Sequence, residues 1–316
     1  ALYHVEQEIA IAARNNMKLS QADALETKGY VLQRFGNYSE SLQTLNQALE
    51  IANNPKNEAR NWFSDSLGTP HEIRLRILGY IQLDLGHIKG STNNIDEQII
   101  HYRTAVRLAE EIGNYELMGL VSMNIGAVYL WQFNKLDSAL QMQQKALASF
   151  QRAGHKKWLN VVLGALGDIY LRKKEDKLAV DYLHKAIQAA REVNNVENVF
   201  WSSHSLTEHY TNVKNRDSSF YYAQKMGDLV RFQSAALPKN AAELYYILLS
   251  KSYKLNNQPD SAYKYLNLAF ILKDSSYQAQ VKNLTDVQNL SFEEKIRAEQ
   301  LEKEKAALQN RVRQYI

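Results

Sequence analysis

A small residue recurs along this chain at intervals of roughly 40 to 50 residues, and no other feature of the sequence constrains the fold as strongly. Successive intervals are 50, 47, 41, 40 and 43 residues. A polar turn follows each small residue, and beyond it small and large residues alternate at helical spacing. This pattern predicts pairs of antiparallel helices. The small residues are Gly29, Gly79, Gly126, Gly167, Thr207 and Ser250.

The second helix of each predicted pair carries small residues at matching positions. Two helices approach within about 8–10 Å only where a small side chain faces a large one. Tyrosines three residues after four of the small positions are the expected large partners, and we expect most of them in the core. These tyrosines are Tyr129, Tyr170, Tyr210 and Tyr253; the matching positions of the second helices are Ser41, Ala139, Ala179, Ser219 and Ala262, followed about two turns later by Ala48, Ala105, Ala146, Ala186, Met226 and Ala269.

Between residues 20 and 275 these features resemble tetratricopeptide repeats (TPRs) in a longer form of about 40 residues per unit. The resemblance implies an all-α fold, a right-handed α-solenoid of about six helix hairpins. The sequence departs from the family in two ways. The proline that usually closes a unit is mostly missing, and the second unit carries "DLGHIKGSTNNIDEQ" as an expected insertion between its helices.

The boundaries of the array can also be predicted. Residues 1–19 have the pattern of a second helix whose partner has been cut away, so we interpret them as the remnant of a preceding unit. Thr69, Pro70 and Glu72 form a capping box that should begin a helix. The stretch before it, "NNPKNEARNWFSDSLG", is expected to be a lengthened second helix followed by a loop.

Composition excludes several classes of function. The net charge is only +4, from 38 basic and 34 acidic residues, which predicts no nucleic-acid partner. The absence of cysteine excludes disulfides and thiol chemistry. His204 and Glu208 lie one helical turn apart, but a metal site requires three or four converging ligands. With no phosphate-binding loop and no convergent catalytic set, we expect a segment that is not an enzyme and holds no cofactor or metal.

A binding groove is the main candidate site. In a solenoid of helix pairs the first helices line the concave face, which suits an extended peptide or a helix of a partner protein. The alternative is an ordinary solvated face. Counted from the small residues, the predicted groove positions, which mix aromatic anchors with both signs of charge, are Glu26, Tyr30, Arg34, Arg76, Tyr80, Asp84, Trp131, Asp168, Arg172, Trp201, His204, Glu208 and Lys251.

After residue 275 the repeat pattern stops. Residues 276–316 predict a long charged helix with a thin apolar stripe, which suits pairing with a second copy of itself in a homodimer. The alternative is a solvated helix that caps the last repeat. The expected seam consists of Leu284, Val287, Leu301, Leu308, Val312 and Tyr315.

This last segment resembles the connector of bacterial TPR-containing sensor histidine kinases. The resemblance implies a sensor region outside the cytoplasm, joined to the inner membrane by a span beyond residue 316 and to a kinase module elsewhere in the protein. Arg311 and Arg313 argue against that topology, because basic residues favour the cytoplasmic side. The alternative is a cytoplasmic TPR regulator or scaffold, such as a peptide-responsive protein or part of a transcription regulator.

Overall fold

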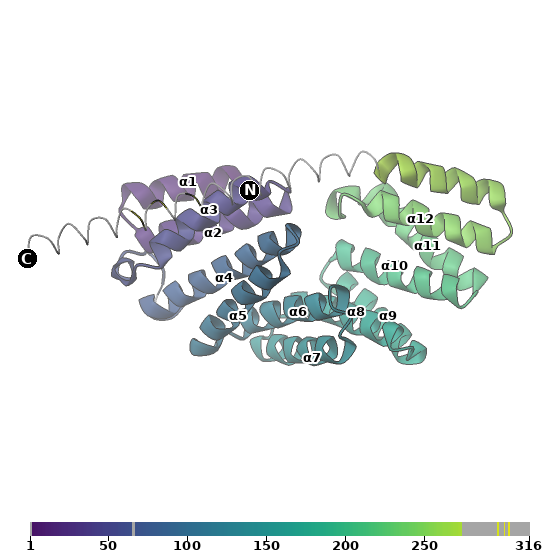
Figure 1. Cartoon of the computed structure of the whole chain (residues 1–316), viewed down its shortest axis with the longest axis horizontal. Helices are drawn as coiled ribbons and strands as arrows, with labels where there is room; N and C mark the ends of the chain where they lie inside the picture. The colour runs from purple at the N-terminus through teal and green to yellow at the C-terminus, as the bar shows by residue number, and fades with distance from the viewer. Residues whose placement is uncertain (1, 65–66, 274–295, 297–299, 301–302, 304–316) are drawn as a thin grey trace, which may run out of the picture. The chain divides into compact units, whose positions relative to one another are not determined.

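The computed structural model describes residues 2–64 and 67–273, together with residues 296, 300 and 303. Within this part the chain is all-α, as predicted, and its helices follow one another as antiparallel hairpins (Figure 1). The seam positions Leu284, Val287, Leu301, Leu308, Val312 and Tyr315 lie outside the described residues, as does almost all of the predicted connector. The dimer and connector assignments therefore stay predictions.

The described residues divide into two compact units, the first up to residue 101 and the second from residue 102 to residue 273. The division falls inside helix α5. The helices of the first unit and the helix at its boundary are α1 (Leu2–Arg14), α2 (Lys18–Arg34), α3 (Tyr38–Ala52), the 3-10 turn η1 (Pro55–Asn57), α4 (Pro70–Ser91) and α5 (Ile95–Glu111).

The second unit continues with three complete helix pairs and one further pair made of α12 and the helical residues 259–273. The first helices also touch one another, α6 with α8, α8 with α10, and α10 with α12, so they form one layer. The bounds are α6 (Tyr115–Trp131), α7 (Leu136–Ala153), α8 (Lys156–Arg172), α9 (Asp176–Glu192), α10 (Val196–Asn212), α11 (Arg216–Phe232), the 3-10 turn η3 (Ser234–Ala236) and α12 (Ala241–Leu255).

Small residues face large ones inside the pairs, as the repeat predicts. A Cβ atom added at Gly29 would lie 2.6 Å from a Leu45 side-chain carbon, and one added at Gly167 would lie 2.6 Å from Leu183. Ser250 uses its hydroxyl to donate to the carbonyl of Ala262 in the partner helix (2.7 Å). Close approach of backbones therefore determines which residues these positions tolerate.

The tyrosines beside the small positions form a second repeated contact. In three pairs a tyrosine of the first helix stacks on a tyrosine of the second helix. The ring centroids are 5.3 Å apart for Tyr170 and Tyr182, 5.7 Å for Tyr210 and Tyr222, and 5.3 Å for Tyr253 and Tyr265. All six rings are half-buried, so they close the edge of the core instead of filling its centre.

Two sequence interpretations were wrong. The expected lengthened second helix before Thr69 is absent, because α3 ends at Ala52 and only the short turn η1 follows. The expected insertion is mostly helical, since α4 continues through "DLGHIKGS" to Ser91 and α5 begins at Ile95. Gly90 lies inside α4. The position requires glycine, because a Cβ atom there would overlap the side-chain amide of Gln98 in α5. The capping box at Thr69 and Glu72 is present as predicted.

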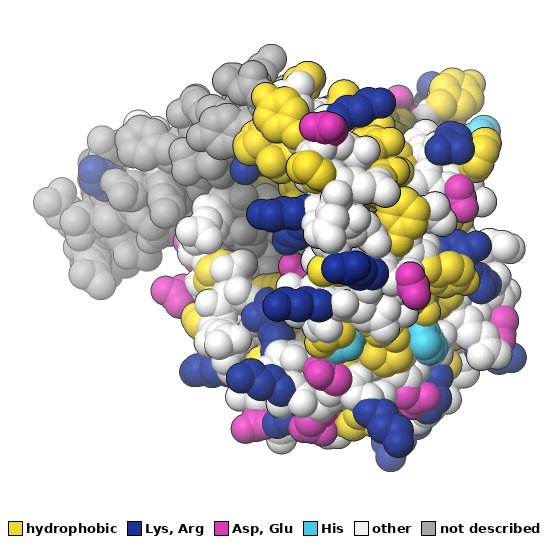
Figure 2. Space-filling view, turned by 90° about the vertical axis from the view of Figure 1, so that its right-hand side faces the viewer, with side chains coloured by type: hydrophobic (Ala, Val, Ile, Leu, Met, Phe, Trp, Pro, Cys, Tyr) yellow, Lys and Arg dark blue, Asp and Glu magenta, His cyan; other side chains and the backbone are white. Residues whose placement is uncertain are grey.

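The surface carries charges of both signs. Figure 2 shows Lys and Arg side chains spread over the face in view, with acidic, histidine and hydrophobic side chains between them. This mixture agrees with the small net charge of +4. The described part of the chain contains no helix with the length and hydropathy needed to cross a lipid bilayer.

Candidate functional site

The ends of α6, α8 and α10 enclose a cavity of about 450 Å³ in the second unit. It opens on the layer of first helices, where the repeat places the groove. Five of the predicted groove residues line it, and they come from three different helices. The lining consists of Trp131, Asp168, Leu171, Arg172, Lys174, Asp176, His204, Ser205, Glu208, His209, Asn212 and Val213.

Trp131 and Arg172 form one wall of this cavity. The guanidinium carbon of Arg172 lies 4.1 Å from the centre of the Trp131 ring, in cation–π geometry. The same guanidinium donates to the Leu130 carbonyl (3.4 Å) and to the Asn134 side-chain oxygen (3.3 Å). Trp131 is nonetheless 58% exposed. The contacts hold Arg172 in place, and the indole is left open to a ligand.

Asp168 lies beside this wall, one turn before Arg172 on α8. Burial raises the pKa of Asp168 to about 6. A hydrogen bond with Ser205 and the charge of Arg172 act in the opposite direction, and Glu208 raises the pKa further. Near neutral pH this carboxyl therefore changes between an acceptor and a donor of hydrogen bonds within a small pH interval.

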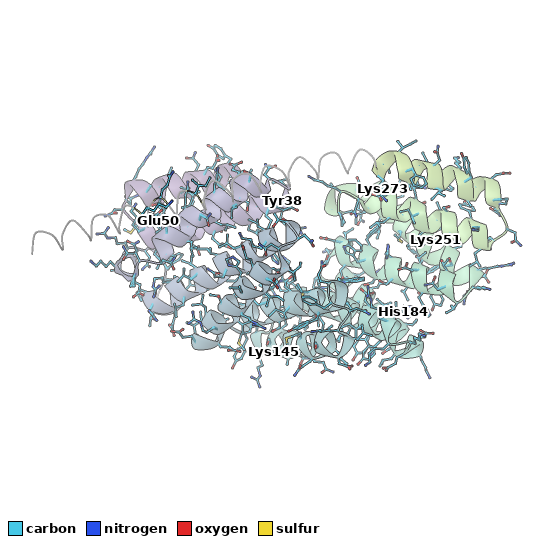
Figure 3. The ribbon with its side chains drawn as sticks, in the orientation of Figure 1. Tyr38, Glu50, Lys145, His184, Lys251 and Lys273 are labelled. Carbon is cyan, nitrogen blue, oxygen red and sulfur yellow. The ribbon has the colours of Figure 1, made fainter. Side chains whose placement is uncertain are left out.

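The opposite wall comes from α10 and reaches α12. The rings of Trp201 and His204 meet edge to face, with centroids 5.8 Å apart. Burial lowers the pKa of His204, which favours the neutral imidazole. Glu208 lies 4.0 Å from Lys251 of α12, whose place Figure 3 labels. All seven groove positions predicted in the second unit thus lie in or beside one surface.

The predicted positions of the first unit gather at α2 and α4, which are in contact. Glu26 is hydrogen-bonded to Asp84, and the charge of Arg76 acts on Asp23 of the same cluster. Tyr30 is 42% exposed and Tyr80 is half-buried. Arg34 lies at the exposed end of α2. These positions form a second group of predicted groove residues, made entirely by helices of the first unit.

Sequence reasoning missed several residues of both groups. Ser205 was not expected to reach Asp168, because their contact depends on the register between α8 and α10. Asp23 could have been found, since it lies three residues before Glu26 and therefore on the same helix face. Asp176 Oδ1 and His209 Nδ1 lie 3.9 Å apart at the cavity, and they come from the start of α9 and the last turn of α10, which no pattern marked.

A second cavity of about 460 Å³ lies among second helices, between α9 and α11. His184, which Figure 3 labels, lies on α9 at this cavity. Its Nε2 lies 2.7 Å from the hydroxyl of Tyr222, which lines the same cavity. Within the described residues, no three His, Asp or Glu side chains are placed to hold a metal ion.

Comparison with known proteins identifies the repeat. Tetratricopeptide repeat profiles match residues 22–55, 120–153 and 162–193. No curated protein sequence matches the chain closely enough to count as a relative. The matched segments coincide with α2 and α3, with α6 and α7, and with α8 and α9, so three separate hairpins carry the repeat signal.

Solved structures share the fold at low sequence identity. The apo form of RapI aligns with a TM-score of 0.61 and 13% identity over 88% of this chain and 99% of that one. A Pyrococcus horikoshii signal transduction ATPase with a TPR sensor, PH0952, gives 0.56 and 17% over 90% of this chain and 45% of that one. The type IV pilus biogenesis factor PilW gives 0.52 and 16%, over 85% and 97%. Tetratricopeptide repeat profiles therefore match three of the hairpins, and the solved structures share the arrangement of successive helix hairpins with this chain.

Proposed function

We propose that this chain is a non-catalytic binding module that takes a peptide, or an extended segment of a partner protein, on its layer of first helices. The cavity at α6, α8 and α10 is the centre of the proposed site. One observation carries the proposal: an exposed tryptophan, Trp131, lies against a fixed arginine, Arg172, beside the buried carboxyl of Asp168. Aromatic and arginine side chains contribute most of the binding energy in protein interfaces.

The chemistry of the cavity supports a peptide over a small metabolite. Its lining combines an indole face, a neutral imidazole, carboxyls and cations at one opening. A peptide offers backbone amides and mixed side chains that can satisfy such a set at the same time. The cavity volume of about 450 Å³ suits one or two side chains of a longer ligand.

A sensory role is the finer proposal. Ligand binding on the first helices would shift the array between two arrangements, and residues 276–316 would pass the change to an output module such as a histidine kinase. The charged helical pattern of those residues supports this role. A ligand shifts such an equilibrium only by its differential affinity for the two states. The alternative, a cytoplasmic TPR regulator or scaffold, shares the binding step and differs in the module encoded after residue 316.

The binding step can be tested without knowing the natural ligand. Peptides selected from a random display library on the immobilised protein would be measured by calorimetry against the wild type and variants. We expect Trp131→Ala to weaken the selected peptides by about 10- to 100-fold, because hot-spot truncation costs roughly 2 kcal/mol or more. Tyr263→Ala is the matched control, since this exposed tyrosine lies in the helical residues 259–273 and lines neither cavity.

Two results would overturn the proposed site. One is a selected peptide that binds Trp131→Ala and the wild type equally. The other is a library that yields no peptide binding below millimolar concentration. The sensory role has its own test, because the coding sequence after residue 316 must encode a membrane span and an output module if it is correct.

A further inference from the structure

The cavity between α9 and α11 lies apart from the proposed peptide site, and the two cavities share no lining residue. Its volume of about 460 Å³ is enough to hold the whole of a small organic molecule. Most of its lining comes from one face of α9 and one face of α11, which are second helices. Ile187 of α9 and Ser203 of α10, both buried, also line it.

Aromatic rings form one wall of this cavity and hold one another in place. The rings of His184 and Tyr222 stack with centroids 6.1 Å apart, and His184 Nε2 lies 2.7 Å from the Tyr222 hydroxyl. Tyr222 also stacks on Tyr210 of α10, with centroids 5.7 Å apart. Tyr221 meets Tyr222 edge to face and is 52% exposed. A flat apolar ligand therefore finds a ring surface that is already ordered.

Two cations enter the cavity from opposite sides, Arg191 from α9 and Lys225 from α11. Among the residues that the structure describes, neither side chain has an ion pair or a hydrogen bond. Lys225 Nζ lies 5.4 Å from the centre of the Tyr221 ring. Lys185, also on α9, does not line the cavity and is paired with Asp181 at 2.7 Å. The unpaired cations are thus the ones that a ligand in the cavity would meet.

The charges of the lining indicate the kind of anion that fits. Apart from His184, the charged side chains are the two cations and the acid Glu192, which leave one net positive charge. One positive charge matches a carboxylate better than a doubly charged phosphate. The guanidinium of Arg191 can donate two parallel hydrogen bonds to a carboxylate, and the side-chain amide of Gln188 adds a neutral donor.

We propose that the cavity between α9 and α11 binds a small aromatic carboxylate as a free molecule. The carboxylate lies between Arg191 and Lys225, and the aromatic body lies against the rings of Tyr221 and His184. This second site goes beyond the proposed peptide-binding function, because it uses the second helices and takes a different class of ligand. It does not depend on the peptide site being correct.

The probe is phenylacetate, and phenylacetamide is its neutral analogue of nearly the same shape. Amide chemical shifts of the labelled full chain would be followed during titration. We expect phenylacetate to shift signals of α9 and α11 at millimolar concentration, and phenylacetamide to bind about tenfold more weakly. Arg191→Gln and Lys225→Gln should each weaken phenylacetate by about tenfold, because each removes a charged hydrogen bond. Glu192→Gln should strengthen it by about twofold, because a partly solvated repulsion disappears.

Two variants serve as controls, and both should bind phenylacetate as the wild type does. Lys185→Gln removes a cation of α9 outside the cavity. Trp131→Ala alters the other cavity, where an aromatic acid could also meet an arginine. Loss of binding in Trp131→Ala, or signals that shift in α6 and α8 instead of α9 and α11, would overturn the proposal.

Three further results would also overturn it. One is equal affinity for phenylacetamide and phenylacetate, and another is unchanged affinity in both Arg191→Gln and Lys225→Gln. The third comes from N-acetyl-phenylalanine, which carries the same ring and carboxylate as the end of a peptide chain. If it bound more tightly than phenylacetate, the cavity would belong to a chain end and not to a free molecule. None of these results changes the outcome of the peptide selection, so the two proposals fail separately.

Discussion

Asp168 in the second unit and Glu26 and Asp84 in the first unit are acids withdrawn from solvent on first helices, Asp84 buried and the other two half-buried, yet their surroundings differ. Ser205 is hydrogen-bonded to Asp168, and Arg172 adds a positive charge one turn away. Glu26 has acids as its charged neighbours. The comparison teaches that residues outside the repeat pattern decide the charge of an acid on the first helices.

The packing beneath these acids is the same in both units, and its disruption should have the largest effect. We expect Gly29→Val and Gly167→Val each to lower the free energy of unfolding by about 3 kcal/mol, because overpacking at a close backbone approach forces the helices apart. A Cβ at either position would lie 2.6 Å from a leucine. Urea denaturation followed by circular dichroism would measure both variants.

Gly164→Ala is the control on the same helix. A Cβ there meets its nearest atom, Asn198 Oδ1, at 3.3 Å, and alanine favours the helix by about 1 kcal/mol, so we expect a change of less than about 1 kcal/mol. If Gly29→Val were harmless while Gly167→Val cost several kcal/mol, the two units would not share one packing rule, and the comparison would lose its common basis.

Much of the fold could be predicted because its causes are local and repeated. Small residues at regular intervals predict the hairpins, and residues such as Asn134 and Asn194 adopt the left-handed backbone that ends helices. The segment between α3 and α4 could not be predicted from the repeat. Polar contacts distant in sequence hold it, including the Trp62 amide donating to Ser20 Oγ and the buried Arg74 donating to Glu58.

Part of the candidate site follows from the repeat. Counting from the small residues selected positions on the first helices, and the structure places Trp131, Asp168 and Arg172 together at one cavity. The raised pKa of Asp168 was not predictable, because it depends on burial between α8 and α10 and on Ser205. A single helix pattern contains no information about the register between neighbouring helices.

The second largest effect concerns Asp168 itself. Its pKa rises from 3.8 to about 6 on folding, so the folded state binds its proton more tightly and loses stability as pH rises through this interval. Asp168→Asn removes that loss and keeps an acceptor for Ser205. We expect a stabilisation of about 1–3 kcal/mol at pH 7 and almost none at pH 3, measured by urea denaturation at both values.

Asp137→Asn should show the opposite sign. A hydrogen bond from Lys173, at 2.8 Å, lowers the pKa of Asp137, so its ionised form stabilises the fold above the ordinary pKa and that contribution is lost as pH falls. If Asp168→Asn stabilised the fold equally at pH 7 and pH 3, the carboxyl of Asp168 would not be desolvated in the folded state. Asp168 could then not serve as the reference with which the pKa of Glu26 is compared.

The smallest expected effect concerns the arginines that accompany each acid. Arg172 stacks on Trp131 at 4.1 Å, whereas Arg76 lies 5.8 Å from the centre of the Phe63 ring. We expect Arg172→Gln to cost about 1 kcal/mol of unfolding free energy and Arg76→Gln about 0.5 kcal/mol, in line with cation–π contacts near a surface.

Carboxyl carbon chemical shifts against pH would follow the same two variants. Arg172→Gln should raise the pKa of Asp168 and Arg76→Gln should raise that of Asp23, because each removes a positive charge that lowers it. Neither variant should lower the pKa of Glu26, whose neighbouring charges are acidic. A fall in the Glu26 pKa in Arg76→Gln would contradict this separation, because removing a positive charge can only raise the pKa of a nearby carboxyl, and a fall would mean that the variant has changed the packing around Glu26.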